Sequence, residues 1–333
     1  MADPLVSVIM PAFNCQPFIA QALSSVCCDP GDLEVVVVDD GSTDETATVV
    51  MGFGDPRVRL IRQSNQGHSA ATNAGVRAAR GKYIKLVDAD DVLGPGHLQA
   101  QLQVLQGAAE QVASCRWGYF IQDPATVQPE TEHVQRDFAD PLDWLICSLT
   151  EDQGMMGGWM WLTPRSVWDR AGGYNPKLGL NNDFDFSIRL LLASRGVRFA
   201  PQAVYCYRKG ISAALSQSRG RKAMTSALLT TLLGCQSLLD REDSARIRRI
   251  CADRLQMWLY EFFPEFPDLA AQAEQRIAEL GGSYRPIQGG LLLKCLVPVL
   301  GWKLARRLQV AVRRIGWRRI ERWKQIRSLG RFK

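Results

Sequence analysis

Short apolar runs alternate with amphipathic stretches along the first 90 residues of the chain. Most of these runs are apolar without clean alternation, which is typical of strands in a parallel sheet that is covered on both faces. The stretches between them have helical periodicity, and spacings of roughly 25–30 residues fit right-handed strand–helix–strand units. The pattern therefore predicts a doubly wound α/β sheet. The predicted strands are 5–10, 33–38, 57–62 and 82–87, and the predicted helices are 16–27, 43–52 and 68–79.

The remainder of the chain changes from a mixed pattern to a purely helical one. Strand-like and helical stretches are mixed in the middle third, and only helical patterns follow. GGSYRPIQGG (281–290) has the glycine and proline content of a linker. We therefore predict a domain over 1–215, a helical extension over 216–280, a linker over 281–290 and a separate tail over 291–333. The predicted strands of the mixed region are 112–121, 157–162 and 203–208, and its predicted helices are 97–106, 164–172 and 183–195.

Cysteine usage and the lack of apolar segments favour the cytosol. The nine cysteines are scattered and form no CxxC pair, which argues against a zinc site or a disulfide framework. The first ten residues contain no Lys or Arg, so they do not resemble a secretory leader. No run approaches the roughly 18 uninterrupted apolar residues of a membrane-spanning helix. From the sequence we expect a cytoplasmic protein.

Acidic and polar residues follow three of the predicted strands. PAFN (11–14), DDGS (39–42) and DADD (88–91) come directly after the apolar runs. In an open parallel sheet, ligands bind outside the carboxyl ends of the strands, so five aspartates should meet at one rim. Because their charges repel, they need a cation or hydrogen-bond donors nearby.

The pair Asp88 and Asp90 is the candidate metal site. Carboxylates one residue apart at a strand end suit Mg²⁺ or Mn²⁺, which prefer oxygen ligands and often bridge to substrate phosphates. The alternative is a solvated, helix-capping turn. The same alternative holds for Asp39 and Asp40, since Asp-Gly-Ser-Thr is ordinary turn chemistry.

Four motifs occur in an informative order and spacing: PAFN (11–14), VVDDGSTDET (37–46), NQGHSAATNAG (65–75) and LVDADD (86–91). Together they resemble glycosyltransferase family two, the inverting enzymes of the GT-A fold. A weaker resemblance continues to about residue 215. It includes WLTPRSVWDRAGGYNPKL (161–178), which is similar to the family's acceptor-side segment, and NDFDFSIRL (182–190), which is similar to its Glu-Asp-x-Asp segment.

The resemblance implies a GT-A type nucleotide-diphospho-sugar transferase with a C-terminal helical extension. Residues 1–110 would form the nucleotide-binding half and 111–215 the acceptor half. Asp183 would be the catalytic base, and Asp88 and Asp90 would hold Mn²⁺ or Mg²⁺. The implied nucleotide-binding residues are Pro11, Ala12, Asn14, Asp39, Asp40, Ser42, Asn65, Gly67, Asn73, Asp88 and Ala89. The implied acceptor or sugar contacts are Asp91, Gly158, Trp159 and Asn182.

This sequence departs from the family pattern at three positions. Thr72 replaces the usual Arg of the third motif, and Asn182 replaces the usual Glu before the base. Lys209 stands where a histidine ligand to the metal is often found. Each change puts one family contact in doubt, but none removes the Asp88 and Asp90 pair or Asp183.

The expected reaction is the transfer of a sugar from a nucleotide-diphosphate donor, with a UDP-sugar favoured, to a hydroxyl of a glycan or a lipid-linked acceptor. Alternatives are a nucleotidyltransferase-like protein and a nucleotide-sugar-binding protein without transfer. The first would need a basic residue in the turn after the first strand, which this chain lacks. No RNA-binding motif with stacked aromatics is visible, so we expect no nucleic-acid partner. Trp159 suits a sugar ring, although an ordinary core position is equally consistent with it.

The tail is strongly basic. Residues 294–333 contain 13 Lys and Arg and one acid, whereas the rest of the chain contains 27 basic and 33 acidic residues. A basic amphipathic helix with tryptophans is typical of one lying in an anionic membrane surface, so we expect peripheral membrane contact through 291–333 at the inner face. The alternative is a helix packed on the body. The predicted apolar face is Leu304, Leu308, Ala311, Val312 and Ile315, and the predicted basic face is Arg306, Arg307, Arg313, Arg314 and Arg318.

Overall fold

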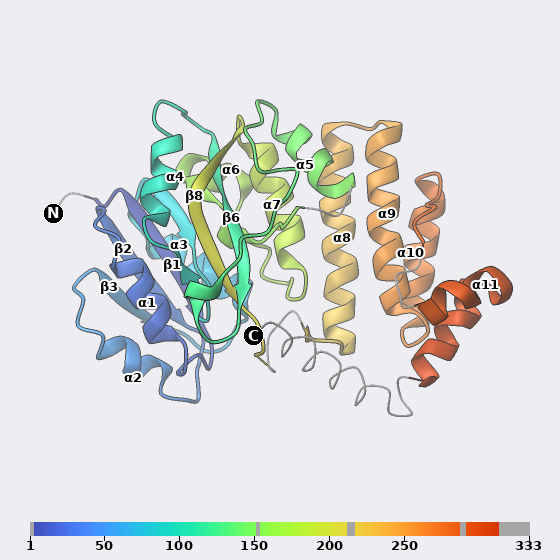
Figure 1. Cartoon of the computed structure of the whole chain (residues 1–333), viewed down its shortest axis with the longest axis horizontal. Helices are drawn as coiled ribbons and strands as arrows, with labels where there is room; N and C mark the ends of the chain where they lie inside the picture. The colour runs from blue at the N-terminus through green and yellow to red at the C-terminus, as the bar shows by residue number, and fades with distance from the viewer. Residues whose placement is uncertain (1–2, 151–153, 212–216, 287–290, 313–333) are drawn as a thin grey trace. The chain divides into compact units, whose positions relative to one another are not determined.

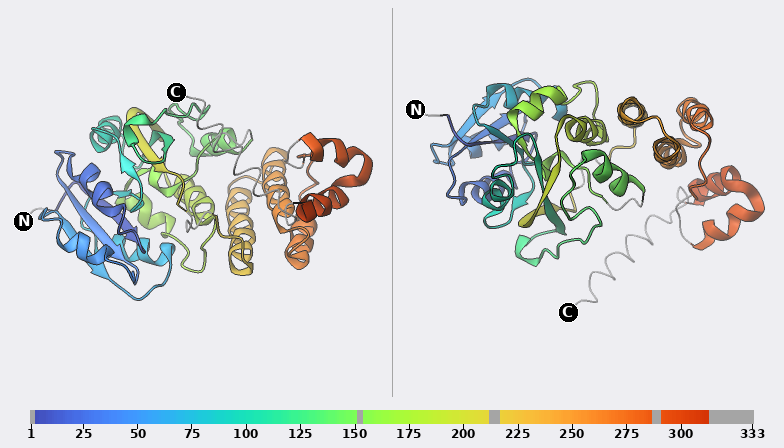
Figure 2. Two further views of the ribbon diagram at one scale, coloured as in Figure 1. Left: turned by 60° about the horizontal axis from the view of Figure 1, so that its bottom comes forward. Right: turned by 90° about the horizontal axis from the view of Figure 1, so that it is seen from above.

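The structure is a computed structural model that describes residues 3–150, 154–211, 217–286 and 291–312. The chain divides into two compact units, Met1–Ile250 and Cys251–Lys333. The first unit contains a single mixed sheet with helices packed on both of its faces (Figures 1 and 2). The second unit is helical in its described residues.

The sheet of the first unit has eight strands in the order β3-β2-β1-β4-β7-β6-β8-β5. The β3, β2, β1 and β4 strands are mutually parallel, and the antiparallel β7 joins them to the parallel pair β6 and β8. This topology confirms the predicted doubly wound mixed sheet. The strands are β1 (Val6–Ala12), β2 (Leu33–Asp39), β3 (Val58–Arg62), β4 (Tyr83–Leu86), β5 (Val92–Leu93), β6 (Val112–Phe120), β7 (Leu162–Pro164) and β8 (Val197–Arg208).

The helices of the first unit pack against the faces of the sheet. The β1 and β2 strands are buried along their whole length, which explains their unbroken apolar sequences. The register places Ala12 opposite Asp39, so the loops after β1 and β2 begin side by side. The helices are α1 (Ile19–Cys27), α2 (Thr46–Met51), α3 (His68–Ala78), α4 (His97–Val104), α5 (Pro141–Thr150), α6 (Arg165–Ala171), α7 (Asn182–Ala193) and α8 (Arg221–Arg241), with 3-10 turns η1 (Pro124–Thr126) and η2 (Gly158–Met160).

The predicted strand over 157–162 is wrong at every residue except the last, Leu162. The chain forms the turn η2 there, and only Leu162–Pro164 pairs in the sheet. Buried side chains replace the sheet hydrogen bonds: Lys85 Nζ donates to Trp159 O at 2.7 Å, and Gln101 Nε2 donates to Met160 O at 2.9 Å. Burial lowers the pKa of Lys85 to about 8. A lysine in an apolar strand carries no sequence signal for this role.

The boundary between the two compact units lies later in the chain than the predicted boundary at residue 215. The α8 helix, which begins the predicted extension, packs on α7 within the first unit. The two helices approach closely, because a Cβ at Gly234 would lie 2.7 Å from the Phe184 ring. This helix therefore extends the α/β unit beyond the predicted boundary at residue 215.

The second unit contains most of α9 (Ala245–Phe262) together with α10 (Pro267–Glu279) and α11 (Leu291–Val312). Gly301 has a left-handed backbone (φ 70°) and divides α11 into two helical pieces. In the second piece, Ala305 is fully buried against Tyr260. Among the residues that the structure describes, no helix combines the length and the apolar character needed to cross a membrane.

The close packing of α3 on the sheet generates a stability prediction. A Cβ at Gly75 would lie 2.4 Å from Ile9 Cγ2 and 3.1 Å from Val38 Cγ2, and both neighbours are fully buried. We expect Gly75→Ala to lower the free energy of unfolding by about 1–3 kcal/mol through overpacking, measured by denaturant titration. The control is Gly179→Ala, where a Cβ meets open space; it should change stability by less than about 0.5 kcal/mol. Equal losses in both variants would contradict this packing argument.

Candidate active site

The loops after β1 and β2 are joined by their own polar side chains. Asn14 adopts a left-handed backbone (φ 52°), which asparagine tolerates better than most residues. Its Oδ1 accepts from Thr43 N at 2.8 Å, and its own N–H donates to Ser42 Oγ at 3.0 Å. Ser42 N in turn donates to Asp39 Oδ1 at 3.0 Å. Three predicted nucleotide-binding residues, Asn14, Asp39 and Ser42, therefore belong to one hydrogen-bonded group, alongside Pro11 and Ala12 at the end of β1.

Asp40 organises the loop that precedes α3. Its buried carboxylate accepts from Gln63 Nε2, Gln66 N and Gly67 N at 2.7 to 2.9 Å. Gly67 has a left-handed φ of 89°, which a side chain would disfavour. Asp40 thus shapes the loop that contains Asn65 and Gly67, and direct contact of these three residues with a nucleotide stays a prediction.

The acidic loop after β4 is held by residues of β8. Arg208 N donates to Asp91 Oδ1 at 2.7 Å, and Arg208 Nε donates to Asp90 O at 2.6 Å. Its guanidinium lies 4.3 Å from the centroid of the Phe120 ring. Tyr205 Oη accepts from Asp88 N at 3.1 Å. Arg208 was not predicted from the sequence, because a lone arginine at the end of a strand belongs to no motif.

Crowding of like charges raises the pKa values in this loop. Burial, followed by the charge of Asp88, raises the pKa of Asp90 to about 6. Burial, followed by the charges of Asp90 and Asp88, raises the pKa of Asp91 well above its usual range. Asp91 is 1% exposed and its Oδ2 has no hydrogen-bond partner, so its predicted contact with an acceptor stays a prediction.

The same crowding fits a divalent cation. Asp88 is 32% exposed and offers hard oxygen ligands beside Asp90, the donor set that Mg²⁺ and Mn²⁺ prefer. A cation there would offset the repulsion that raises the pKa of Asp90. Within the described part of the chain, no three His, Cys, Asp or Glu side chains gather closely enough to hold a metal by themselves. Other ligands would have to come from substrate oxygens or water.

The predicted base Asp183 lies in the first turn of α7. Tyr174 Oη donates to Asp183 Oδ1 at 2.5 Å. Gly158 must lack a side chain here, because a Cβ would lie 2.0 Å from Tyr174 Oη and 3.1 Å from Asp183 Oδ1. Burial raises the pKa of Asp183 and the charge of Asp88 adds to this effect, whereas His68 and the Tyr174 hydrogen bond oppose it. The carboxylate is thus oriented and made more basic than a solvated aspartate.

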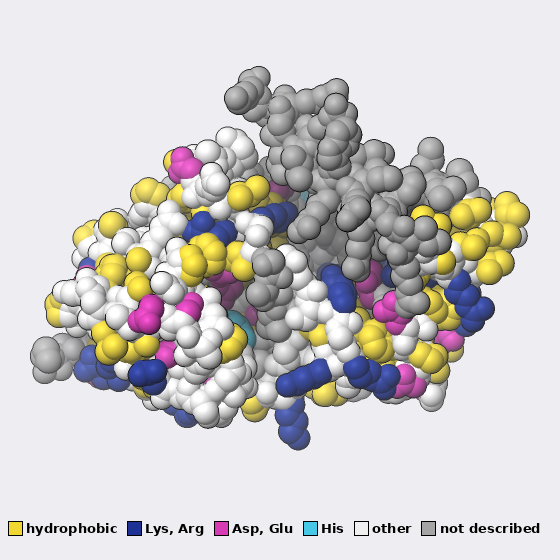
Figure 3. Space-filling model, turned by 90° about the horizontal axis from the view of Figure 1, so that it is seen from below, with side chains coloured by type: hydrophobic (Ala, Val, Ile, Leu, Met, Phe, Trp, Pro, Cys, Tyr) yellow, Lys and Arg dark blue, Asp and Glu magenta, His cyan; other side chains and the backbone are white. Residues whose placement is uncertain are grey.

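His68, which sequence reasoning did not identify as a site residue, links the acidic loop to α7. Its Nε2 lies 3.4 Å from Asp88 Oδ1, and its Nδ1 lies 3.1 Å from Asn182 Nδ2. Burial lowers the pKa of His68, but the hydrogen bond and charge of Asp88 outweigh it, with smaller contributions from Asp183 and Asp90, so the net shift is upward. Figure 3 shows a hollow on this side of the molecule in which acidic side chains and a histidine are visible.

Asn73 and Trp159 have structural partners. The side chain of Asn73 donates to Tyr174 O at 2.7 Å and accepts from Tyr174 N at 2.9 Å, so it holds the residue that contacts Asp183. Trp159 is 4% exposed and stacks on Tyr205 with ring centroids 4.1 Å apart. Their predicted contacts with nucleotide and sugar stay predictions, as does the backbone contact expected at Ala89.

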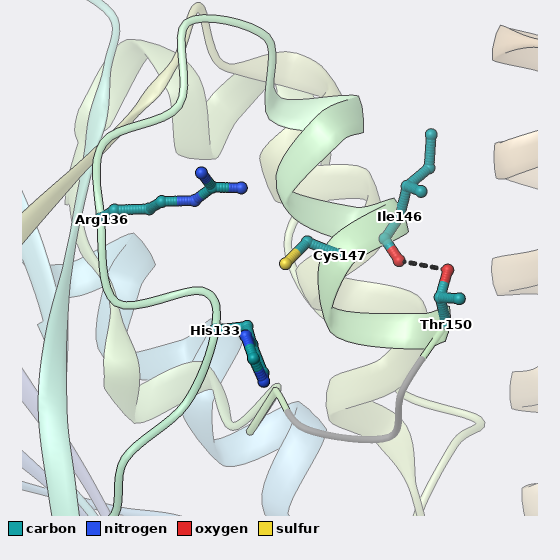
Figure 4. Close-up of a pocket in the computed structure, with 5 residues that line it drawn as sticks. All are labelled: His133, Arg136, Ile146, Cys147 and Thr150. Atoms are coloured by element: carbon teal, nitrogen blue, oxygen red, sulfur yellow. Dashed lines mark hydrogen bonds between the residues drawn. The ribbon is translucent and has the colours of Figure 1, made fainter.

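A separate cavity of about 560 Å³ lies beside α5 and the loop that precedes it (Figure 4). No predicted site residue lines it, and its lining residues are His133, Arg136, Ile146, Cys147 and Thr150. The acidic loop, His68 and Asp183 therefore define the candidate site, and this cavity is not part of it.

Known proteins resemble this chain in sequence and in fold. Residues 7–165 match the sequence profile of Glycosyl transferase family 2. This part of the chain belongs to glycosyl transferase family 2. The matched residues include the loops after β1, β2 and β4, whereas Asp183 and Arg208 lie beyond the matched range.

A curated relative in this family is the uncharacterized glycosyltransferase EpsJ of Bacillus subtilis (strain 168), which is 27% identical over 211 residues. The match covers 62% of this chain and 61% of EpsJ. The chain thus spans about three fifths of the length of this relative.

Two solved structures have the same fold. The S. aureus TarS 1–349 complex with UDP-GlcNAc is similar at a TM-score of 0.60 and 15% identity, covering 84% of this chain and 93% of that one. The mannosyltransferase PcManGT from Pyrobaculum calidifontis, in complex with GDP-Man and Mn²⁺, is similar at 0.53 and 18%, covering 93% and 86%. The predicted GT-A type fold is thereby confirmed.

The Tyr174–Asp183 hydrogen bond generates a pH prediction. The bond lowers the pKa of Asp183, so Tyr174→Phe should raise that pKa further. A general base acts only when it is deprotonated, so activity is lost as the pH falls through its pKa. The low-pH side of the pH–activity profile, its acid limb, should therefore move to higher pH in the variant. The measurement is donor turnover against pH, with Tyr83→Phe on β4 as the control. An unchanged acid limb in Tyr174→Phe would show that Asp183 is not the titrating base.

Proposed function

We propose that this protein is a metal-dependent, inverting glycosyltransferase that moves a sugar from a nucleotide-diphosphate donor to a hydroxyl acceptor in glycoconjugate synthesis. The observation that carries the proposal is the position of one histidine between the acidic loop and the start of α7, where the base lies. His68 contacts Asp88 and also contacts Asn182, the residue before Asp183. The charge of Asp88 also contributes to the raised pKa of Asp183, which supports assigning both carboxylates to one site.

The residues present supply most of the required chemistry. Asp183, oriented by Tyr174, would take the proton from the acceptor hydroxyl as that oxygen attacks the sugar from the face opposite the leaving diphosphate. Attack from that face inverts the anomeric centre. Asp88 and Asp90 would hold Mn²⁺ or Mg²⁺, whose charge stabilises a leaving diphosphate when bound. General base catalysis of this kind contributes roughly 10²–10⁴-fold to the rate.

A UDP-sugar is the donor that we propose first. TarS, whose fold this chain shares, was solved with UDP-GlcNAc, and PcManGT was solved with GDP-Man and Mn²⁺. The hydrogen-bonded group of Asn14, Asp39 and Ser42 lies at the rim where a nucleoside would bind in an open sheet. The proposed acceptor is a glycan or a lipid-linked sugar.

Thermal unfolding with nucleotide sugars tests donor and metal together. We expect UDP or a UDP-sugar with Mn²⁺ to stabilise the protein by about 2.7 kcal/mol at 100 times the dissociation constant. Asp90→Ala should lose the part of the stabilisation that depends on Mn²⁺. Asp183→Asn should keep the whole stabilisation yet reduce release of the nucleoside diphosphate by about 10²-fold or more.

The matched control for the base is Asp169→Asn on the exposed side of α6, which should turn over normally. Binding with no turnover in the parent protein, across donors and acceptors, would indicate a nucleotide-sugar-binding protein. Equal turnover in Asp183→Asn and the parent protein would contradict the assignment of the base.

We also propose that α11 and the basic tail hold the enzyme on the cytoplasmic, anionic face of a membrane. Leu304, Leu308 and Val312 are 44%, 41% and 40% exposed and follow one another at four-residue spacing, so they form an outward apolar stripe. Lys303 and Arg307 lie on the same exposed helix, and most of the chain's excess positive charge follows in residues 313–333. An apolar stripe beside basic residues suits an anionic lipid surface.

Two members of the predicted amphipathic pattern face inward instead. Arg306 was predicted on the solvated face, but it is 7% exposed and its guanidinium donates to Phe263 O and Gln309 Oε1. Trp302 is one of the tail tryptophans expected at a membrane interface, but it packs edge-on against Tyr260 and Phe263. Position 306 lies on the helix face that packs within the second unit, which explains both corrections. The remaining predicted positions, Arg313, Arg314, Ile315 and Arg318, lie outside the described residues.

Liposome co-sedimentation tests the membrane proposal. We expect Leu304→Ser with Leu308→Ser to weaken binding to anionic vesicles at least about tenfold, because two apolar side chains lose their lipid contact. Leu229→Ser, at an equally exposed leucine of α8, is the control and should bind as the parent does. Unchanged binding of the double variant, or equal binding to neutral vesicles, would contradict the proposal.

A further inference from the structure

His68, in the first turn of α3, is the contact point of two positions where the sequence departs from the family pattern. Thr72 Oγ1 donates to His68 O at 2.9 Å, and the amide of Asn182 meets His68 Nδ1 at 3.1 Å. Thr72 is fully buried and Asn182 is 5% exposed, whereas His68 is 27% exposed. Both replacements therefore contact one residue, Thr72 at its main-chain oxygen and Asn182 at its partly exposed imidazole.

A chain of hydrogen bonds fixes which imidazole nitrogen carries the proton. Ser69 has one hydroxyl proton, and its Oγ donates that proton to Leu178 O at 2.8 Å. Ser69 Oγ must therefore accept from Asn182 Nδ2, 2.9 Å away. The second N–H of Asn182 is then left for His68 Nδ1, which has to accept. A neutral imidazole with an accepting Nδ1 carries its proton on Nε2.

The Nε2 proton of His68 faces the acidic loop. Asp88 Oδ1 lies 3.4 Å from Nε2, and an ionised carboxylate can only accept. The Tyr174 ring packs edge-on against the imidazole at a centroid distance of 5.8 Å and limits its rotation. Asn182 on one side of the imidazole and Asp88 on the other thus both favour the Nε2–H tautomer.

We propose that Asn182 is a positioning residue that holds His68 as its Nε2–H tautomer, so that His68 donates to Asp88 and ties the acidic loop to the start of α7. Asn182 then acts through His68 rather than by touching the acceptor. The hydrogen-bond assignment stands independently of the enzyme's activity, whereas its consequence for the cation rests on the proposed function. Partners that orient a ligating carboxylate typically contribute 10- to 100-fold to metal affinity.

An acidic residue at position 182 would favour the opposite tautomer of His68. A carboxylate offers no donor, so it would require a proton on His68 Nδ1. Asn182→Asp, which preserves the shape of the side chain, therefore separates the tautomer from packing. The position of the donor can be tested in a similar way. In His68→Gln the side-chain amide can occupy the position of Nε2, whereas in His68→Asn it can occupy only the position of Nδ1.

The test uses the full chain labelled with ¹⁵N-histidine. Long-range ¹H–¹⁵N correlation should show His68 protonated at Nε2 and bare at Nδ1 in the parent, and protonated at Nδ1 in Asn182→Asp. In parallel, Mn²⁺ affinity is measured by electron paramagnetic resonance in the presence of UDP. We expect about tenfold weaker binding in His68→Ala, His68→Asn and Asn182→Ala, with most of the affinity retained in His68→Gln.

His133→Ala, at a histidine beside α5 outside this network, is the control and should bind Mn²⁺ as the parent does. Thermal unfolding confirms that each variant is folded, and rescue by His68→Gln excludes a general loss of structure. A parent protein protonated at Nδ1, or an Asn182→Ala variant with unchanged tautomer and Mn²⁺ affinity, would overturn the proposal. Absence of Mn²⁺ binding in the parent, with the tautomer as assigned and altered in Asn182→Asp, would support the positioning role and contradict metal dependence.

Discussion

The repulsion among Asp88, Asp90 and Asp91 is the constraint on which this site depends. Two unit charges 4 Å apart interact by about 4 kcal/mol at an effective dielectric constant of 20, so carboxylates crowded in a half-buried loop are costly without compensation. The fold provides part of that compensation through the backbone and guanidinium of Arg208. Burial first, and then the repulsion that is left over, raises the pKa values of Asp90 and Asp91. A site built in this way gains most from a ligand that brings positive charge.

The mixed sheet explains how distant segments reach this loop. The end of β8 pairs antiparallel to β5 directly after the acidic residues, with Val92 opposite Cys206. Arg208 thereby arrives 118 positions after the main-chain oxygen of Asp90 that it binds. On the other side, the loop before α3 is shaped by Asp40 and leads directly into His68. The side of the sheet formed by β1, β2 and β4 thus supplies the acids, and the end of β8 supplies their counter-charge.

The sequence predicted most of the strands and helices, because burial on both faces leaves a visible apolar run, as in β2. It also indicated which loops meet, since the carboxyl ends of parallel strands share one rim. It could not reveal side chains that act across the fold. Lys85, Gln101 and Arg208 are single polar residues whose partners are main-chain oxygens far along the chain.

The sequence also could not separate structural from ligand-facing roles within a motif. Asp40 and Asn73 were both predicted to bind nucleotide, yet their side chains are engaged with Gly67 N and with the backbone of Tyr174. His68 sits inside a recognised motif, but a lone histidine has no periodicity or spacing that marks it. Only the three-dimensional neighbours Asp88 and Asn182 distinguish it from an ordinary helix residue.

The most direct measurement is anomalous diffraction at the manganese edge from crystals grown with UDP and Mn²⁺. The account predicts one manganese peak within coordinating distance of Asp88 or Asp90 and of a phosphate oxygen of UDP, on the side of the loop that faces Asp183. A manganese peak elsewhere, or UDP bound at the rim with no manganese beside the acidic pair, would contradict it.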